Sequence, residues 1–399
     1  MEMDQRSLNF EVIVVGAGPA GSLAARTAAE HGVHVALLEE HPIVGQPVQC
    51  AEGLGVAGME VSGLAPGPPV TCQKVDTIGL ITPNGNIFNL TGRNADGYNL
   101  DRRVFDRMLS ENAVKVGAEL MVNTRALGVI EEEGVVVGIR ARHSGEPLEI
   151  RAKVVIGADG HASIIRRSAG LTRYFDDYGM CAQYQLGDLD LESPNTNEIY
   201  LGQKYAPGGY AWVFPKSREV ANVGLGVRKM NKQSALAQLK EFVRNDPRFK
   251  DAPILSTSGG VCPATGTLDK IVDDGLMLVG DAAGQLIPMS GSGIHSGMVA
   301  GRMAGEVAAR AVGDDDVSAS RLGEYSDAFN REWGKKIRDS SRMIGVIERL
   351  TDDELDTLSE TITQEDIMNL VGGEAVTRTL ARMVLRAPQL SLKLISKMR

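Results

Sequence analysis

Continuous apolar runs indicate the buried strands of this 399-residue chain, and two of them flank a helical segment near its beginning. Val12–Val15 and Val33–Leu38 have the length and composition of short strands that are covered on both faces. The residues between them are rich in alanine, which favours a helix. Strand, helix and strand in this order predict a parallel βαβ unit. A further run, Leu276–Val279, predicts another buried strand of the same sheet.

A second, partly alternating pattern indicates an antiparallel sheet. Its predicted strands are separated by turn-like residues and comprise Thr196–Leu201, Tyr210–Pro215 and Val220–Val227. Tyr210, Trp212 and Phe214 occupy every second position of the middle strand and therefore share one face. The chain has only 2 Trp, 8 Tyr and 8 Phe, so this row is unusual. A wall of rings suits a long apolar ligand that offers dispersion contacts and few hydrogen bonds. Aromatic packing in a core under covering helices is the alternative.

The last part of the chain has a helical pattern. Within residues 321–350, apolar side chains recur at helical spacing, and Thr351 with Glu354 predicts a capping box for the next helix. We expect these helices to cover the sheet. Residues 376–399 contain six basic and no acidic residues among Leu, Ile, Met and Val. This tail predicts either an amphipathic helix on an anionic membrane or a helix packed on the protein with a solvated basic face.

Composition excludes several classes of function. The net charge of −9 argues against a nucleic-acid partner, and no apolar run is long enough to span a bilayer. The four cysteines are scattered and form no C-x-x-C pair, so we expect reduced thiols and no metal site. The acidic, polar beginning of the chain lacks the features of a secretory signal. We therefore expect a cytoplasmic protein, with the basic tail allowing a peripheral position on the inner face of the membrane.

The first βαβ unit carries a dinucleotide fingerprint. Gly16, Gly18 and Gly21 form G-x-G-x-x-G between the first strand and the helix, where they allow a tight turn, a close approach to pyrophosphate and helix packing. The helix N-terminus adds amide donors and positive potential. Glu39 ends the second strand, where its carboxylate can accept a ribose hydroxyl and would repel a 2′-phosphate. FAD or NAD fits this site, and NADP does not.

Later segments favour the flavin. Gly280-Asp281 follows the strand Leu276–Val279, and a carboxylate there suits ribityl hydroxyls. Gly291–Ile294 opens a helix whose first amides would stabilise the negative charge of a reduced flavin. Between the two halves, Asp159-Gly160, Ser163 and Arg166 follow another apolar run.

These motifs, together with Arg102-x-x-Phe105-Asp106, resemble the flavoprotein group that includes aromatic hydroxylases and geranylgeranyl reductases, over residues 10 to about 310. Two stretches narrow the resemblance. Residues 49–53 (QCAEG) and 207–214 (PGGYAWVF) are similar to the C-x-E-G and P-x-x-Y-x-W-x-F motifs of archaeal geranylgeranyl reductases, which saturate the prenyl chains of archaeal ether lipids. The flavin contacts implied by the resemblance are Ala20, Glu39, Cys50, Ala51, Gly53, Arg102, Ala126, Asp281, Gly293 and Ile294.

The resemblance implies an α/β (α+β) fold with a Rossmann-type FAD-binding domain, an inserted antiparallel sheet that binds the prenyl chain, and a C-terminal helical segment. The expected FAD-binding domain comprises residues 10–66, 100–175 and 265–313, the substrate domain 67–99 and 176–264, and the helical domain 314–399.

The implied reaction is saturation of geranylgeranyl chains on archaeal glycerophospholipids. An isolated alkene requires hydride from flavin N5 and a proton, delivered in a dry pocket. Cys50 and, less favourably, Tyr210 are the candidate proton donors, and Tyr210, Trp212 and Phe214 are the candidate substrate contacts. The chain has one dinucleotide fingerprint, so NAD(P)H, ferredoxin or a reduced deazaflavin must deliver electrons from outside.

Other functions remain open from sequence. A flavin monooxygenase of the aromatic hydroxylase type shares the motif at Asp159–Arg166. A reductase of geranylgeranyl-chlorophyll or of a prenyl diphosphate would use the same chemistry. A prenyl-binding protein without chemistry would not need Asp281 or the helix start at Gly291–Ile294.

Overall fold

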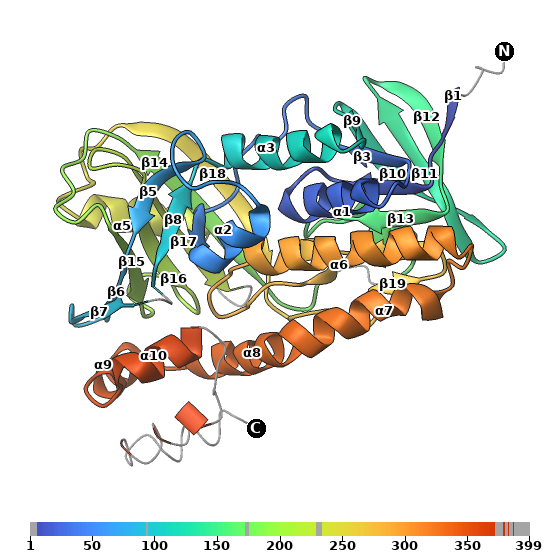
Figure 1. Cartoon of the computed structure of the whole chain (residues 1–399). Coiled ribbons are helices and arrows are strands. Elements are labelled where there is room, and N and C mark those ends of the chain that lie inside the picture. The colour runs from blue at the N-terminus through green and yellow to red at the C-terminus, as the bar shows by residue number, and fades with distance from the viewer. Residues whose placement is uncertain are drawn as a thin grey trace.

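The computed structural model describes residues 6–92, 95–171, 175–228, 234–371, and the single residues 378, 379, 382 and 386. Two sheet-containing halves lie side by side, and a row of C-terminal helices runs beneath both (Figure 1). The central sheet of the first half has the strand order β19 (Val272–Asp273), β20 (Leu276–Leu278), β13 (Val154–Gly157), β2 (Val12–Val15), β3 (Val35–Leu38), β9 (Glu119–Met121). Its pairs are parallel except for the edge hairpin of β19 and β20.

This sheet is a buried layer, as its apolar runs predict. Every residue of β2, β3 and β13 is buried. One face packs against helices α1 (Pro19–Glu30), α3 (Arg102–Lys115) and α6 (Ile294–Gly313). The other face is covered by a smaller sheet with the order β1 (Arg6–Asn9), β12 (Glu146–Arg151), β11 (Val135–His143), β10 (Thr124–Glu132). Side chains from both sheets share one hydrophobic core.

The second half is a larger sheet whose strands follow the order β18 (Ile254–Pro263), β14 (Tyr178–Leu186), β17 (Ala221–Arg228), β16 (Tyr210–Pro215), β15 (Thr196–Leu201), β6 (Thr77–Ile81), β7 (Ile87–Thr91). The strands predicted around the aromatic row are all present. The sheet is antiparallel with one exception, because β15 and β6 pair in parallel. These two strands come from segments far apart in the sequence, so no hairpin forces them to run in opposite directions.

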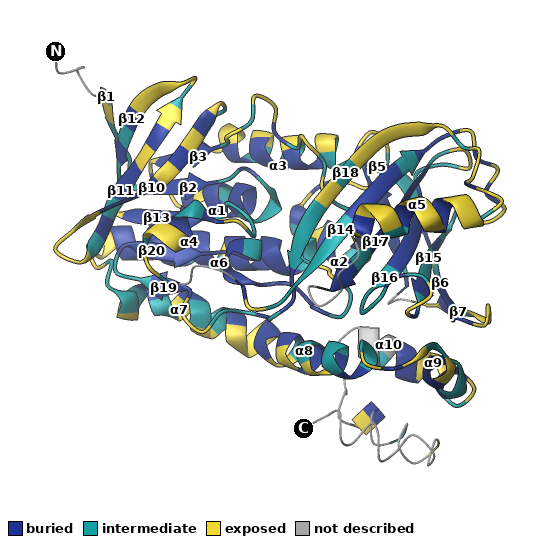
Figure 2. Cartoon of the chain, turned by 180° about the vertical axis from the view of Figure 1, so that it is seen from behind, coloured by how far each residue is buried: buried dark blue, intermediate teal, exposed yellow. Residues whose placement is uncertain are grey.

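Helix α5 (Ala235–Asn245) covers the outer face of this sheet and leaves its own outer side exposed (Figure 2). A small sheet ordered β4 (Gly53–Gly55), β8 (Gly97–Leu100), β5 (Thr71–Val75) connects the two halves beside the short helix α2 (Val56–Ser62). It combines residues that the sequence assigns to both the FAD-binding and the substrate domain. That division by residue number stays a prediction.

The C-terminal helices form the third layer. The expected helix over 321–350 comprises α7 (Ala319–Phe329), a π-helical turn η2 (Asn330–Gly334) and α8 (Lys335–Ile347). Helices α9 (Asp352–Ser359) and α10 (Gln364–Val371) follow, and the capping box of Thr351 and Glu354 is present at the start of α9. Within the described part of the chain, none of the helices combines the length and the apolar character that a membrane span requires.

The basic tail lies largely outside the described residues. Three of its arginines are described, and two of them contact the buried Asp366 of α10: Arg382 at 2.9 Å and Arg386 at 2.8 Å. These two cations are therefore paired with the protein itself.

Candidate active site

The glycine loop at the N-terminus of α1 is shaped by close backbone contacts. A Cβ atom on Gly16, whose φ is +102°, would lie 2.5 Å from the carbonyl oxygen of Ala158. A Cβ on Gly21 would lie 1.9 Å from the carbonyl oxygen of Gly16. Gly18 differs, because a Cβ there would meet no atom within 4 Å. The loop thus packs tightly on the protein side and presents Gly18 and the helix N-terminus to open space, as a pyrophosphate requires.

Glu39 follows β3 and turns its carboxylate back toward the same loop. The carboxylate accepts hydrogen bonds from the backbone N–H groups of Ala17 at 3.2 Å and His41 at 3.0 Å. The backbone N–H of Thr124 donates to the Glu39 carbonyl at 2.8 Å, so strand β10 starts beside it. Ala126 follows on β10, is 7% exposed and packs in the core outside the cavity described below. The predicted flavin contact of Ala126 stays a prediction.

Asp281 lies in a short 3₁₀ turn, η1 (Gly280–Ala283), that packs against the start of α6. A Cβ on Gly293 would lie 3.1 Å from Asp281 Oδ1, so the helix start and the carboxylate are adjacent. Burial raises the pKa of the Asp281 carboxyl, and the Arg102 guanidinium opposes this rise. The Gln285 side chain accepts from Gly280 N–H at 2.8 Å and donates to the Tyr325 hydroxyl at 2.6 Å, which fixes the turn.

The residues Asp159, Ser163 and Arg166 form an internal scaffold. The Ser163 hydroxyl donates to Asp159 at 2.6 Å and accepts from the backbone N–H of Arg166 at 2.9 Å, which caps α4 (Ile164–Ser168). The buried Arg166 guanidinium donates to the carbonyl oxygens of Ala282 and His161, both at 2.9 Å. This motif therefore ties the turn after β13 to the turn that carries Asp281.

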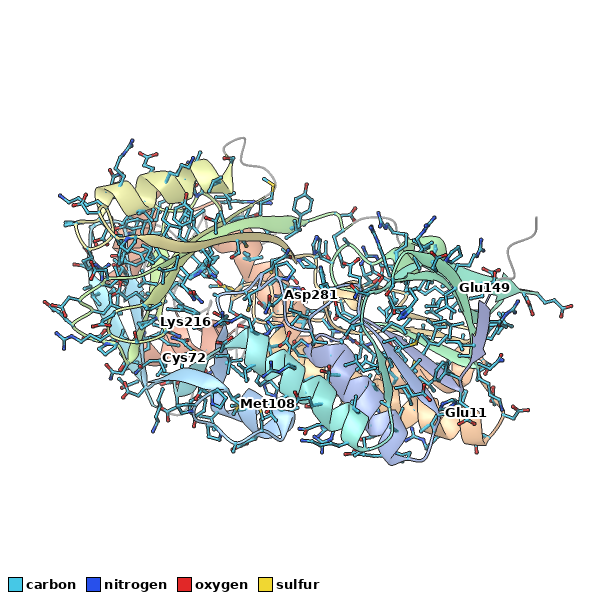
Figure 3. The ribbon with its side chains drawn as sticks, turned by 90° about the horizontal axis from the view of Figure 1, so that it is seen from above. Glu11, Cys72, Met108, Glu149, Lys216 and Asp281 are labelled. Atoms are coloured by element: carbon cyan, nitrogen blue, oxygen red, sulfur yellow. The ribbon has the colours of Figure 1, made fainter. Side chains whose placement is uncertain are left out.

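One continuous cavity of about 780 Å³ begins at this scaffold and crosses the boundary between the two halves. Figure 3 shows Asp281 near the middle of the molecule, between the half with Lys216 and Cys72 and the half with Glu11 and Glu149. The first end of the cavity is lined by the residues predicted for the flavin, namely Gly18, Ala20, Cys50, Ala51, Gly53, Arg102, Asp281, Gly293 and Ile294. The structure thus brings together residues from widely separated segments.

The aromatic row forms a wall of the same cavity. Tyr210, Trp212 and Phe214 line it, while Ala211 and Val213 on the opposite face of β16 pack against the core under α5. The Tyr210 hydroxyl donates to the Ser290 carbonyl at 2.6 Å, and the Trp212 indole N–H donates to the Gln183 side chain at 2.8 Å. Burial raises the pKa of the Tyr210 phenol. The predicted facing of β16 is confirmed, and the polar atoms of the row are satisfied within the protein.

The far end of the cavity is mainly apolar and lies between the sheet and the C-terminal helices. Strands β6, β7 and β15 contribute Ile78, Leu80, Phe88, Ile199 and Leu201, and the segment from α8 to α10 contributes Ile344, Ile347, Leu355, Leu358, Ile362 and Ile367. Asp352 fixes this cover by accepting from the backbone N–H groups of Gln203 at 2.6 Å and Lys204 at 3.0 Å. The expected role of the helices as a cover for the sheet is confirmed.

The Cys50 thiol is half-buried beside the Arg102 side chain. Its sulfur accepts from the backbone N–H of Glu52 at 3.2 Å. Burial raises the pKa of the Cys50 thiol, and Arg102 acts in the opposite direction. Arg102 itself forms two hydrogen bonds with Asp106, at 2.6 and 2.7 Å. The four cysteines are free thiols, and Cys181 and Cys262 also line the cavity. No group of side chains suited to hold a metal occurs among the described residues.

Comparison with known proteins agrees with this geometry. A family model described as "FAD dependent oxidoreductase" matches residues 11–190, and one described as "Geranylgeranyl reductase catalytic domain" matches residues 177–262. A digeranylgeranylglycerophospholipid reductase 2 from Methanopyrus kandleri is 39% identical over 392 residues, covering 96% of this chain and 98% of the relative. The chain belongs to the digeranylgeranylglycerophospholipid reductase family.

Two further relatives support this family membership. A digeranylgeranylglycerophospholipid reductase from Methanocella arvoryzae is 38% identical and covers 97% of this chain and 98% of its own length. The solved structure of a geranylgeranyl bacteriochlorophyll reductase-like protein from Thermoplasma acidophilum superposes with a TM-score of 0.88 at 31% identity. It covers 98% of this chain and 100% of the neighbour. As in other members of the FAD oxidoreductase class, FAD is the cofactor, and the open space at Gly18 and the cavity beside Asp281 fit it.

Sequence reasoning assigned no role to Glu52 of the reductase motif C-x-E-G. The structure shows this residue 3% exposed, with a φ of +74° and with its carboxylate bonded to three separate segments. An acidic residue beside a glycine in a loop gives no signal of burial. Its place within a family motif was the only available indication.

Proposed function

We propose that this protein is an FAD-dependent reductase that saturates the double bonds of geranylgeranyl chains on archaeal ether glycerophospholipids. The observation that supports this proposal most directly is that one cavity is lined both by the predicted flavin contacts and by a cluster of Ile, Leu and Phe side chains. A monooxygenase of small polar aromatics has no use for a channel lined by Ile, Leu and Phe over its far half. A reductase of prenyl lipids, as the names of the relatives indicate, would need such a lining to hold its chain.

Different residues of the chain have different roles in this reaction. When bound and reduced by an external donor, FAD would supply the hydride. Trp212 and Phe214 hold the chain by dispersion contacts, and the helices from α8 to α10 exclude water from it. Cys50 keeps its proton at neutral pH because burial raises its pKa, so a thiol proton is available at the alkene carbon. Tyr210 directs its hydroxyl to the Ser290 carbonyl, which makes it a support for the loop before α6 rather than the first donor.

The electrons come from outside the chain. The sequence contains one dinucleotide fingerprint, and FAD occupies it in this proposal. A reduced nicotinamide, a ferredoxin or a reduced deazaflavin coenzyme therefore acts as the external donor. Stopped-flow reduction of the bound flavin by each donor in turn identifies it.

An anaerobic single turnover tests the function. The protein is reduced with dithionite and mixed with unsaturated digeranylgeranylglyceryl phospholipid, while the flavin spectrum and the mass of the chains are followed. We expect two mass units per double bond, with flavin oxidation in step. A flavin that stays reduced until air enters, over chains of unchanged mass, would support the monooxygenase instead.

A second substrate belongs in the same assay. The likeness to a geranylgeranyl bacteriochlorophyll reductase-like structure favours a chlorophyll-type prenyl substrate as the alternative. Faster flavin oxidation by geranylgeranyl-chlorophyll than by the phospholipid would assign the protein to that substrate.

We also propose that residues 376–399 hold the cover against an anionic membrane, so that a lipid enters beside α10. The six basic residues and no acidic residue of this tail support the idea, although Arg382 and Arg386 pair with Asp366. Sedimentation with anionic vesicles should fall strongly when these residues are deleted. Unchanged binding would remove the proposal.

A further inference from the structure

The loop Gln49–Gly53, which carries Cys50 to the cavity, is held mainly by side chains of the large sheet. The Gln183 side chain on β14 donates to the Cys50 carbonyl at 3.0 Å. The Asn222 side chain on β17 donates to the Ala51 carbonyl at 3.2 Å. A Cβ on Gly53 would lie 2.9 Å from the Phe214 ring, so the loop packs directly on the aromatic row. The sheet that binds the lipid therefore sets the position of this loop.

The strongest of these attachments is a buried ion pair. Lys216 follows β16 directly, and its ammonium group lies 2.6 Å from Glu52 Oε2, with the two side chains only 8% and 3% exposed. Asn222 donates to the same oxygen at 2.7 Å, and the backbone N–H of Arg102 donates to Glu52 Oε1 at 2.8 Å. Lys216 also donates to the Leu100 carbonyl at 2.7 Å. Both charges are thus fully compensated, as buried charges must be.

The arrangement is costly for the protein to maintain. Glu52 has a φ of +74°, which a residue with a long side chain adopts rarely. Burying an ion pair also costs desolvation energy that apolar residues of the same volume would not require. Strained and expensive features of this kind cluster where a site needs a fixed geometry. Here the pair joins the end of β16, the end of β8 and the start of α3, from which the Arg102 side chain enters the cavity.

We propose that Glu52 and Lys216 are positioning residues for the reduction. They fix the loop of residues 49–53 and the start of α3 to strand β16, so that the Cys50 thiol, the flavin and the alkene are held at fixed positions relative to one another. This inference rests on the proposed function. The pair acts through Cys50 and Arg102 and does not itself contact the substrate. A reacting group displaced by about 1 Å loses roughly a hundredfold in rate, so such a clamp has a measurable consequence.

The test compares three variants with the wild-type holoenzyme. Glu52→Gln removes one charge and leaves Lys216 buried without its counterion. The double variant Glu52→Gln with Lys216→Met removes both charges, which spares the fold an unpaired buried cation. Arg248→Met is the control, because Arg248, in the turn after α5, forms an ion pair at 2.9 Å with Glu198 on β15 of the same sheet, and neither residue lines the cavity.

Two measurements are made on each variant with FAD bound. The first is the rate of alkylation of Cys50 by iodoacetamide, followed by peptide mass spectrometry, with Cys181 of the same sample as the internal reference. The second is the rate at which the phospholipid oxidises the dithionite-reduced flavin. In the single and the double variant we expect alkylation of Cys50 to rise about tenfold as the loop loosens, with Cys181 unchanged. We expect flavin oxidation by lipid to fall by about tenfold to a hundredfold.

Three results would count against the proposal. A double variant that matches wild type in both measurements would show that the pair only stabilises the fold. Equal losses in Arg248→Met would show a general effect of weakening the sheet. Slower flavin oxidation with unchanged Cys50 alkylation would show that the loop has not moved. If the wild-type flavin is not oxidised by lipid, the proposed function fails, while the alkylation comparison still reports the position of the loop.

Discussion

The two ends of the cavity are built on different physical principles. At the FAD end, backbone atoms and glycines set the shape, and a Cβ on Gly16 or Gly21 would overlap a carbonyl oxygen. At the far end, side chains from β6, β7, β15 and the C-terminal helices set it by their summed volume. The first end therefore excludes a side chain at Gly16 and Gly21, whereas the second end can be rebuilt as long as the volume is kept. A rigid cofactor and a flexible chain require this difference.

The largest expected effect is at Gly21. In Gly21→Ala the new methyl group would lie 1.9 Å from the Gly16 carbonyl oxygen, so the loop must shift, at a cost of about 3 kcal/mol in the free energy of unfolding. We expect this variant to lose FAD during purification. The matched variant Gly18→Ala has free space for its methyl group, so the unfolding free energy of its FAD-free form changes by less than about 0.5 kcal/mol. It should still bind FAD poorly. Denaturant unfolding measures the stability of the two variants, and the flavin absorbance measures their FAD content. An equal loss of stability in Gly18→Ala and Gly21→Ala would contradict this account.

The next effect concerns the proton. Cys50→Ala should slow lipid reduction about a hundredfold with FAD still bound, the usual contribution of a positioned acid. Tyr210→Phe should slow it far less, because this hydroxyl proton is held by the Ser290 carbonyl. Single-turnover rates with the phospholipid distinguish them, and the reverse order would make Tyr210 the donor.

The pH dependence follows from the same residue. Because burial raises the pKa of the Cys50 thiol, its protonated form persists through neutral pH. The rate should therefore be flat there and should fall only as the pH rises past that raised pKa. A decline between pH 6 and 8 would assign the proton to a different group.

At the far end we expect a graded response. Ile362→Trp fills part of the apolar end of the cavity with a larger side chain, and Ile362→Val serves as the conservative control. The tryptophan variant should raise the KM for a geranylgeranyl chain about tenfold while sparing a chain that is one isoprene unit shorter. Equal effects on both chains would mean that the end of the chain lies elsewhere.

The smallest effect is at the attachment of the cover. Asp352→Ala removes the acceptor for the backbone N–H groups of Gln203 and Lys204, at a cost of about 1 kcal/mol. Hydrogen exchange in α9 should become faster while exchange in β2 and β13 stays unchanged. Uniformly faster exchange would indicate that the cover is part of the central folding unit.

Elements in all three parts of the molecule were predictable where their signals are local. Val12–Val15, Tyr210–Pro215 and the capping box at Thr351 have the predicted bounds, since periodicity and turn residues determine them directly. The facing of the aromatic row followed from the alternation of strand residues. Gly280-Asp281 was found by its place after an apolar run.

The remainder depends on contacts between distant segments. The parallel pairing of β6 with β15 joins residues 77–81 to residues 196–200, and no local pattern encodes it. The π-helical turn at Asn330–Gly334 interrupts a helix whose apolar spacing looks regular in sequence. The role of Glu52 depends on its contacts with Lys216, Asn222 and Arg102, which no local sequence pattern indicates.

The apolar far half of the cavity has a consequence for how a polyene can be handled. The rings and aliphatic side chains there would contact each isoprene unit of a bound chain in a similar way, because they offer no hydrogen bond that favours one position of the chain. A chain held in this way can slide along its own length within the cavity. Successive double bonds can then reach the flavin without release of the lipid. The depth to which the chain is inserted decides which double bond lies beside the flavin.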